Sequence, residues 1–160
     1  MESSLDSKLQ VEKIFDEFAA MVLGYIKTLL CDTHRSEDVL QNVFIRLYKS
    51  IDCGCDVKNI KAYLFTIARN ECFREIEKGT NDKLSYGEIF EIKQESMEIS
   101  EKLAIEEALL SLPCEQREIV YLKVYGELTF QEIAQELKIS QNTVASRYRY
   151  AMEKLTEFLN

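Results

Sequence analysis

The residues best suited to chemistry lie in a polar, basic stretch near the C-terminus of the chain. Six side chains there are of the kinds that read DNA: Gln141, Asn142, Thr143, Ser146, Arg147 and Arg149. Arginine pairs bidentately with guanine or phosphate, Gln and Asn reach adenine, and Ser and Thr make shorter contacts. The chain as a whole carries a net charge of −8, which argues against a free-standing DNA-binding protein. This stretch is locally basic, however, and favours a helix that faces nucleic acid.

The surrounding sequence predicts the elements that hold these side chains. Thr129-x-x-Glu132 is a capping box, which opens a short helix over residues 129–137. A turn follows, and Ser140 then caps a final helix that reaches about Phe158. Two helices joined by a short turn make a helix-turn-helix pattern. A plain helical hairpin with a solvated polar face has the same spacing, so spacing alone leaves both interpretations open.

The first half of the chain predicts three further helices. Apolar residues at three- and four-residue intervals favour a helix over residues 11–30, and Ser36 is the expected N-cap of the second. The second helix has an apolar stripe and a polar face that contains Asp38, Gln41, Asn42, Arg46 and Lys49. Residues 52–57 read as a loop around Gly54, and a third helix is expected from about residue 59 to 78.

Periodicity is lost over residues 79–98, which we interpret as a linker. A second unit follows over residues 99–160, in which Pro113 is expected as the first residue of a helix. One Pro and five Gly are too few for a fold of many short strands. The prediction is an all-α protein with two small helical domains joined by a linker: residues 1–78, then the linker 79–98, then residues 99–160 with the helix-turn-helix.

Composition excludes several classes of function. One histidine, no Gly-rich phosphate loop and no cluster of metal ligands leave little from which to build an enzyme, so we expect no enzyme, no cofactor and no metal. Five cysteines at irregular spacing argue against a disulfide framework. Cys53 and Cys55 are best explained as ordinary reduced thiols, with a metal or redox role as the alternative. No membrane-spanning run or signal peptide is apparent, which predicts a cytoplasmic protein.

Two groups of motifs resemble the extracytoplasmic-function (ECF) sigma factors, minimal two-region members of the sigma-70 family. One group is similar to their fourth region and consists of Ala108-Leu109-Leu110-Ser111-Leu112-Pro113, Gln116-Arg117-Glu118-Ile119-Val120, Leu128-Thr129-Phe130, Glu132-Ile133-Ala134 and Asn142-Thr143-Val144-Ala145-Ser146-Arg147. The other is similar to their second region and consists of Glu37-Asp38-Val39-Leu40-Gln41-Asn42-Val43-Phe44 and Ala62-Tyr63-Leu64-Phe65-Thr66-Ile67-Ala68-Arg69-Asn70. The resemblance covers roughly residues 10–78 and 100–158.

The resemblance implies a sigma factor that directs RNA polymerase to promoters. In that family the second region binds the clamp coiled coil of the polymerase β′ subunit and reads the minus-10 element. The fourth region binds the β-flap tip and reads the minus-35 element. By position, the polymerase-binding residues are Asp38, Gln41, Asn42 and Arg46. The minus-10 residues are Asn59, Lys61, Tyr63, Arg69 and Asn70, together with the loop 52–57. The minus-35 residues are Gln141, Asn142, Thr143, Ser146, Arg147 and Arg149.

Three questions stay open at this level. The chain has Glu75 and Glu77 where the family is usually rich in arginine, and Ala145 where many members have lysine. One alternative is therefore a sigma-like adaptor that binds polymerase or another partner and reads promoters weakly. Another is a stand-alone helix-turn-helix regulator, which has no reason to keep the polar face around Gln41. An anti-sigma partner is compatible with the resemblance but has no signal of its own in these residues.

Overall fold

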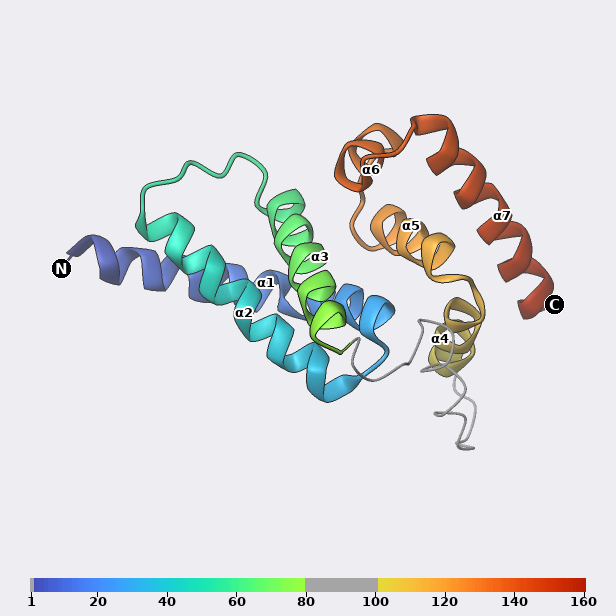
Figure 1. Cartoon of the computed structure of the whole chain (residues 1–160), viewed down its shortest axis with the longest axis horizontal. Coiled ribbons are helices and arrows are strands. Elements are labelled where there is room, and N and C mark those ends of the chain that lie inside the picture. Colours follow the sequence, from blue (N-terminus) through green and yellow to red (C-terminus); the bar gives the residue numbers. More distant parts are fainter. Residues whose placement is uncertain (1, 80–100) are drawn as a thin grey trace. The chain divides into compact units, whose positions relative to one another are not determined.

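The computed structural model describes residues 2–79 and 101–160, and every regular element within these ranges is an α-helix. The helices separate into two compact units, α1 to α3 and α4 to α7 (Figure 1). The all-α prediction is confirmed. None of the described helices is both long and apolar enough to cross a membrane. The predicted linker, apart from Gly79, and the residues 99–100 lie outside the described residues, so the predicted domain boundaries stay predictions.

The N-terminal unit is a three-helix bundle formed by α1 (Glu2–Leu30), α2 (Thr33–Asp52) and α3 (Ile60–Lys78). All three helices pack against one another. The stripe on α2 supplies the buried residues Val39, Val43, Phe44 and Leu47, as its spacing predicts. Tyr25 from α1 and Phe65 from α3 meet edge to face in the core, with their ring centroids 5.1 Å apart, and neither side chain is accessible to solvent.

Helix α1 begins nine residues earlier than its apolar periodicity indicates. The first turns contain few apolar residues that face inward, and Leu5 and Leu9 are exposed. The inward contacts are polar instead: Ser7 is buried, and the Ser4 hydroxyl lies 2.9 Å from the Tyr48 hydroxyl of α2. A search for apolar periodicity cannot detect a helix whose packed face is made of serine.

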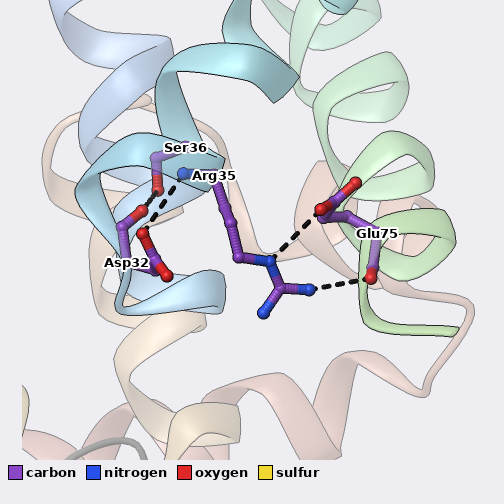
Figure 2. A network of polar contacts seen from close by, with 4 residues as sticks. All are labelled: Asp32, Arg35, Ser36 and Glu75. Carbon is purple, nitrogen blue, oxygen red and sulfur yellow. Dashed lines mark hydrogen bonds and ion pairs between the residues drawn. The ribbon is translucent and has the colours of Figure 1, made fainter. Parts of the chain in front are cut away.

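The expected cap of α2 at Ser36 is wrong, because the helix starts one turn earlier with Asp32 as its N-cap (Figure 2). The Asp32 carboxylate accepts a hydrogen bond from the Arg35 backbone N–H at 3.2 Å. Ser36 lies inside the first turn, fully buried, and its hydroxyl donates to the Asp32 carbonyl at 2.5 Å. Asp and Ser are both strong N-cap residues, so the sequence offers two plausible starts. In the structure the helix uses the earlier start at Asp32, so only two residues connect α2 to α1.

Arg35 ties the start of α2 to the end of α3 (Figure 2). Its Nε donates to the Glu75 carboxylate at 3.2 Å, and its Nη2 donates to the Glu75 backbone carbonyl at 2.8 Å. The Glu75 carbonyl also accepts from the Gly79 N–H, so Arg35 adds a second donor to this carbonyl near the helix end. Gly79 follows directly, and a Cβ at this position would meet Arg35 Nη2 at 3.0 Å. Glycine therefore leaves room for the arginine.

The C-terminal unit contains α4 (Glu101–Ser111), α5 (Cys114–Val124), α6 (Phe130–Leu137) and α7 (Gln141–Leu159). Helix α7 packs against each of the other three. One cluster of its core joins α4, α5 and α7 through Leu112, Val120, Ala151, Leu109, Tyr148 and Leu155. Pro113 is the N-cap of α5 rather than its first residue, one position from the prediction. Its fixed φ suits either position, so the sequence cannot separate them.

Burial gives Tyr121 of α5 an unusual acid–base property. Burial, with a smaller contribution from the neighbouring charge of Tyr125, raises the pKa of Tyr121 from 10.0 to about 12. The two rings stack with their centroids 4.6 Å apart. Between pH 10 and 12 the unfolded chain loses this proton and the folded chain keeps it, so stability falls as the pH rises through this window.

We expect the free energy of unfolding to fall by about 2 kcal/mol from this group between pH 10 and 12, since one pKa unit corresponds to about 1.4 kcal/mol. The measurement is urea unfolding at several pH values for the wild type and for Tyr121→Phe. The two proteins differ by this phenol alone, so the difference between their pH profiles reports on Tyr121. Parallel curves would show that this phenol titrates normally.

Candidate nucleic-acid interface

The helix-turn-helix is fixed by caps at both of its helices. Thr129 Oγ1 accepts from the Glu132 N–H at 3.1 Å, and the Glu132 carboxylate accepts from the Thr129 N–H at 3.0 Å, so the predicted capping box is confirmed. Helix α6 ends at Lys138, whose φ of 56° is left-handed. Ser140 then caps α7, as predicted, by accepting from the Thr143 N–H at 3.1 Å. The angle between the two helices therefore depends on local hydrogen bonds encoded over twelve residues.

The six predicted residues of α7 do not share one face. At about 100° per residue, Asn142, Ser146 and Arg149 lie within about 60° of one another. These three are opposite the buried Val144 and Ala151. Thr143 lies on one edge of this face and Gln141 on the other. Arg147 lies beyond Thr143, about 40° from the buried Ala151. The Thr143 hydroxyl is also 2.7 Å from the Ser140 hydroxyl, so it takes part in the cap.

The two arginines of α7 have different surroundings, because they lie about 160° apart on the helix. Arg149 is exposed, with its guanidinium 5.2 Å from the centre of the Tyr150 ring. Arg147 is half-buried and leans toward α5, where its Nη2 lies 3.5 Å from Oε2 of Glu115. The sequence analysis did not identify Glu115. Its place in the first turn of α5, near the quoted fourth-region motif, is visible in the sequence, but its contact with α7 depends on the tertiary fold.

The predicted minus-10 residues of α3 also divide into groups. Asn59 caps the helix by accepting from the Ala62 N–H at 3.1 Å, and Tyr63 and Asn70 lie about 20° apart on the side away from the core. Lys61 lies about 160° from Tyr63, so it does not join this surface. Arg69 is about 120° from Tyr63, with its guanidinium 4.5 Å from the centre of the Phe73 ring.

Tyr63 is half-buried, and its position has a structural cause. Its hydroxyl lies 2.6 Å from the Ser50 hydroxyl, which links the first turn of α3 to the last turn of α2. The Ser50 carbonyl in turn accepts from the Cys55 N–H at 3.1 Å, and Gly54 has a left-handed φ of 83°. This is a Schellman turn. The loop before α3 is therefore ordered at its start, and it presents both Cys53 and Cys55 to solvent as free thiols. Over the described ranges, no three His, Cys, Asp or Glu side chains are grouped to hold a metal ion.

The predicted polymerase-binding face of α2 is largely an exposed surface. Asp38, Gln41 and Asn42 are exposed and lie within about 100° of one another. Ile45, half exposed, lies among them, about 40° from Gln41. The sequence analysis missed Ile45 because an isoleucine does not belong to a polar pattern. An apolar side chain surrounded by polar ones is nevertheless the usual composition of an interface centre.

Arg46 is turned away from this face toward α3. It forms an ion pair with Glu71, which is buried and also pairs with Arg74 at 3.2 Å. Arg46 therefore braces α2 against α3, although half of its side chain stays accessible. The acidic end of α3 has a related explanation. Glu75 is the partner of Arg35 and does not simply project into solvent as a negative charge.

Comparisons with known proteins add to this geometry. The family description "Sigma-70 region 2" matches residues 14–81, and "Sigma-70, region 4" matches residues 102–155. The ECF RNA polymerase sigma factor SigL of Mycobacterium tuberculosis is 29% identical over 150 residues, covering 89% of this chain and 84% of SigL. The ECF RNA polymerase sigma factor SigW of Bacillus subtilis is 29% identical over 162 residues, covering 91% of this chain and 87% of SigW.

A solved structure shows the same fold. The sigma factor RpoE from Bartonella quintana, in complex with the anti-sigma factor NepR, superposes with a TM-score of 0.73 at 24% identity. The similarity covers 92% of this chain and 95% of that one. Both regions match in the order and at the positions that the motifs of α2, α3, α5, α6 and α7 indicate. The chain therefore belongs to the sigma-70 family, and the relatives that it resembles over most of its length are ECF RNA polymerase sigma factors.

Proposed function

We propose that this protein is a sigma factor that directs core RNA polymerase to specific promoters and starts transcription there. The observation that carries the proposal is the presence, in one chain, of a capped helix-turn-helix and an exposed polar face on α2 that contains Asp38, Gln41 and Asn42. A helix-turn-helix alone suits many regulators. Together with region 2 and region 4 matches over most of the chain, the pair is specific to a sigma factor.

Each surface has a role in this proposal. The polar face of α2 binds the clamp coiled coil of the polymerase β′ subunit, and region 4 binds the β-flap tip. Asn142, Ser146 and Arg149, flanked by Thr143, Arg147 and Gln141, enter the major groove of the minus-35 element. Asn59, Tyr63 and Asn70, with the loop 52–57, face the minus-10 strand, where bases leave the stack and are held by stacking and edge contacts. Lys61 and Arg69 lie off that surface and have no direct part in this contact.

The acidic composition is compatible with this role. A sigma factor reaches DNA as part of a large holoenzyme, so it need not supply all of the attraction for phosphates itself. A net charge of −8 disfavours binding of the free protein to DNA. We further propose that the protein is not an enzyme, needs no cofactor and works in the cytoplasm. An anti-sigma factor belongs among its candidate partners, since the RpoE structure contains one.

The decisive experiment is to purify the tagged full-length protein with core RNA polymerase and to sequence the DNA that the complex protects. A shared two-part promoter motif in the protected DNA would support the proposal. Polymerase bound without such a motif would favour the sigma-like adaptor, which Ala145 and the acidic residues at the end of α3 suggest. DNA bound without polymerase would identify a stand-alone helix-turn-helix regulator.

The polymerase face has its own test. Gln41→Ala combined with Asn42→Ala should weaken assembly with core polymerase by roughly tenfold, since two polar contacts of about 0.5–1.5 kcal/mol each are lost. Assembly is measured by titration of labelled core enzyme. Both side chains are exposed, so the thermal unfolding midpoint should stay unchanged.

The matched control is Lys13→Ala combined with Glu17→Ala. These residues are exposed on α1 of the same unit, and their joint removal leaves the net charge unchanged. The control should assemble like the wild type. If both variants lost affinity for core polymerase equally, the α2 face would not be a specific polymerase contact. If neither variant lost affinity, the proposed polymerase face would have no support.

A further inference from the structure

One ion pair joins a proposed DNA-reading residue to a different helix of the same unit. Arg147 Nη2 of α7 lies 3.5 Å from Glu115 Oε2 of α5. The Glu115 side chain is 72% exposed and the Arg147 side chain 32% exposed, so a carboxylate stands at the edge of the proposed minus-35 surface. A negative charge at that place repels DNA phosphates. The Glu115–Arg147 pair adds little to the stability of the fold, because exposed ion pairs contribute little to folding. We therefore looked for a role of this carboxylate in DNA binding.

Local structure places Glu115 at the start of a helix. It is the second residue of α5, within the first turn, where the positive end of the helix dipole favours a carboxylate. The preceding N-cap is Pro113, which makes no side-chain hydrogen bond to the helix. Glu115 is therefore set on a rigid helix end directly beside Arg147, and Arg147 is held on the α5 side of α7.

The contact leaves Arg147 able to bind a base. A guanidinium has five N–H donors in a planar fork, and the pair with Glu115 involves only Nη2. The remaining donors suffice for a bidentate contact to guanine O6 and N7. An arginine side chain is flexible, and an acidic neighbour that favours one side of α7 for it reduces the ordering needed when the base contact forms.

We propose that Glu115 is a positioning residue for promoter selectivity: it orients the Arg147 guanidinium toward a guanine edge and at the same time weakens binding to non-cognate DNA. This inference rests on the proposed function, because it takes the Arg147 side of α7 as part of the minus-35 surface. It makes two predictions of opposite sign. Removing the charge of Glu115 lowers affinity for the cognate element and raises affinity for unrelated DNA.

The experiment uses holoenzyme assembled from core polymerase and the full-length chain. Two probes are needed: a duplex that carries the minus-35 sequence selected by the wild-type holoenzyme, and a scrambled duplex of equal composition. Glu115→Gln keeps the size of the side chain and removes its charge. We expect the ratio of the two affinities to fall at least about fivefold, with cognate binding weaker and scrambled binding equal or tighter. Glu157→Gln, the same charge change at the far end of α7, should leave the ratio unchanged.

A double-mutant cycle with Arg147→Ala completes the test. If Glu115 acts through Arg147, Glu115→Gln should not change the ratio further once Arg147 is absent. Equal tightening on both probes would overturn the inference, because it would show simple repulsion without positioning. An unchanged ratio would overturn it as well. A ratio that is insensitive to Arg147→Ala itself would instead contradict the proposed placement of the minus-35 surface, so the two failures are distinguishable.

Discussion

Arg147→Ala is expected to lower affinity for the cognate minus-35 element by roughly 5- to 150-fold, because a lost bidentate base contact costs about 1–3 kcal/mol. Polymerase binding should stay nearly intact, since Arg147 is not among the residues proposed to bind polymerase, which lie on α2. Arg147 is half-buried beside Glu115, so the variant also removes an ion pair, but that pair is largely exposed and its loss has little effect on folding. The readouts are transcription from the cognate promoter and core-enzyme binding by the same preparation.

Lys154→Ala is the matched control for Arg147→Ala. Lys154 is an exposed basic residue two turns further along α7, so Lys154→Ala removes the same single positive charge as Arg147→Ala. A phosphate contact carries no sequence information, so this variant should weaken cognate and scrambled DNA alike, if it weakens either. Equal losses of promoter binding and polymerase binding in Arg147→Ala would contradict the placement of the DNA surface.

Phe65→Ala is expected to destabilise the N-terminal unit by about 3–5 kcal/mol, the usual cost of removing a buried aromatic side chain. Phe65 has no exposed surface, and its ring packs edge to face on Tyr25, so the substitution leaves a cavity at the centre of the three-helix bundle. A small domain has only about 5–15 kcal/mol of stability in total, so much of the protein should lack a folded region 2 at 37 °C. Urea unfolding followed by circular dichroism measures the loss.

The control for this variant is Phe65→Leu, which keeps most of the apolar volume and should cost about 1 kcal/mol. Polymerase capture should fall with the folded fraction in Phe65→Ala and stay close to wild type in Phe65→Leu. A loss of stability below about 1 kcal/mol in Phe65→Ala would mean that the core around Tyr25 collapses onto the vacated space.

The sequence was sufficient wherever local rules decide the structure. The capping box of Thr129 and Glu132, the Ser140 cap and the apolar stripe of α2 depend on residues three or four positions apart, and each was predicted correctly. The errors occurred where tertiary contacts decide between local options. The N-cap of α2 is Asp32 and not Ser36. Helix α1 extends to residues before Val11, where the Ser4 hydroxyl contacts Tyr48 of α2 and Ser7 is buried.

The candidate sites show the same division. Residue types and motif positions led to the correct family, but they did not tell which side chains share a surface. Arg46 and Lys61 were grouped with their sequence neighbours. An ion pair turns Arg46 toward Glu71, and the helical register places Lys61 far from Tyr63. Glu115 could not be identified from its own helix, since its partner lies 32 positions away on α7.

The Arg35 contact has a consequence for the dynamics of α3. Helix ends normally fray, because their last carbonyls lack internal partners. At this end, the Glu75 carbonyl accepts from the Gly79 N–H and from Arg35, a residue 40 positions earlier in the chain. Opening of the last turn of α3 therefore also breaks its contact with the start of α2. A tertiary contact thus opposes fraying at this end, and amide hydrogens in that turn should exchange more slowly than those of a helix end without such a contact.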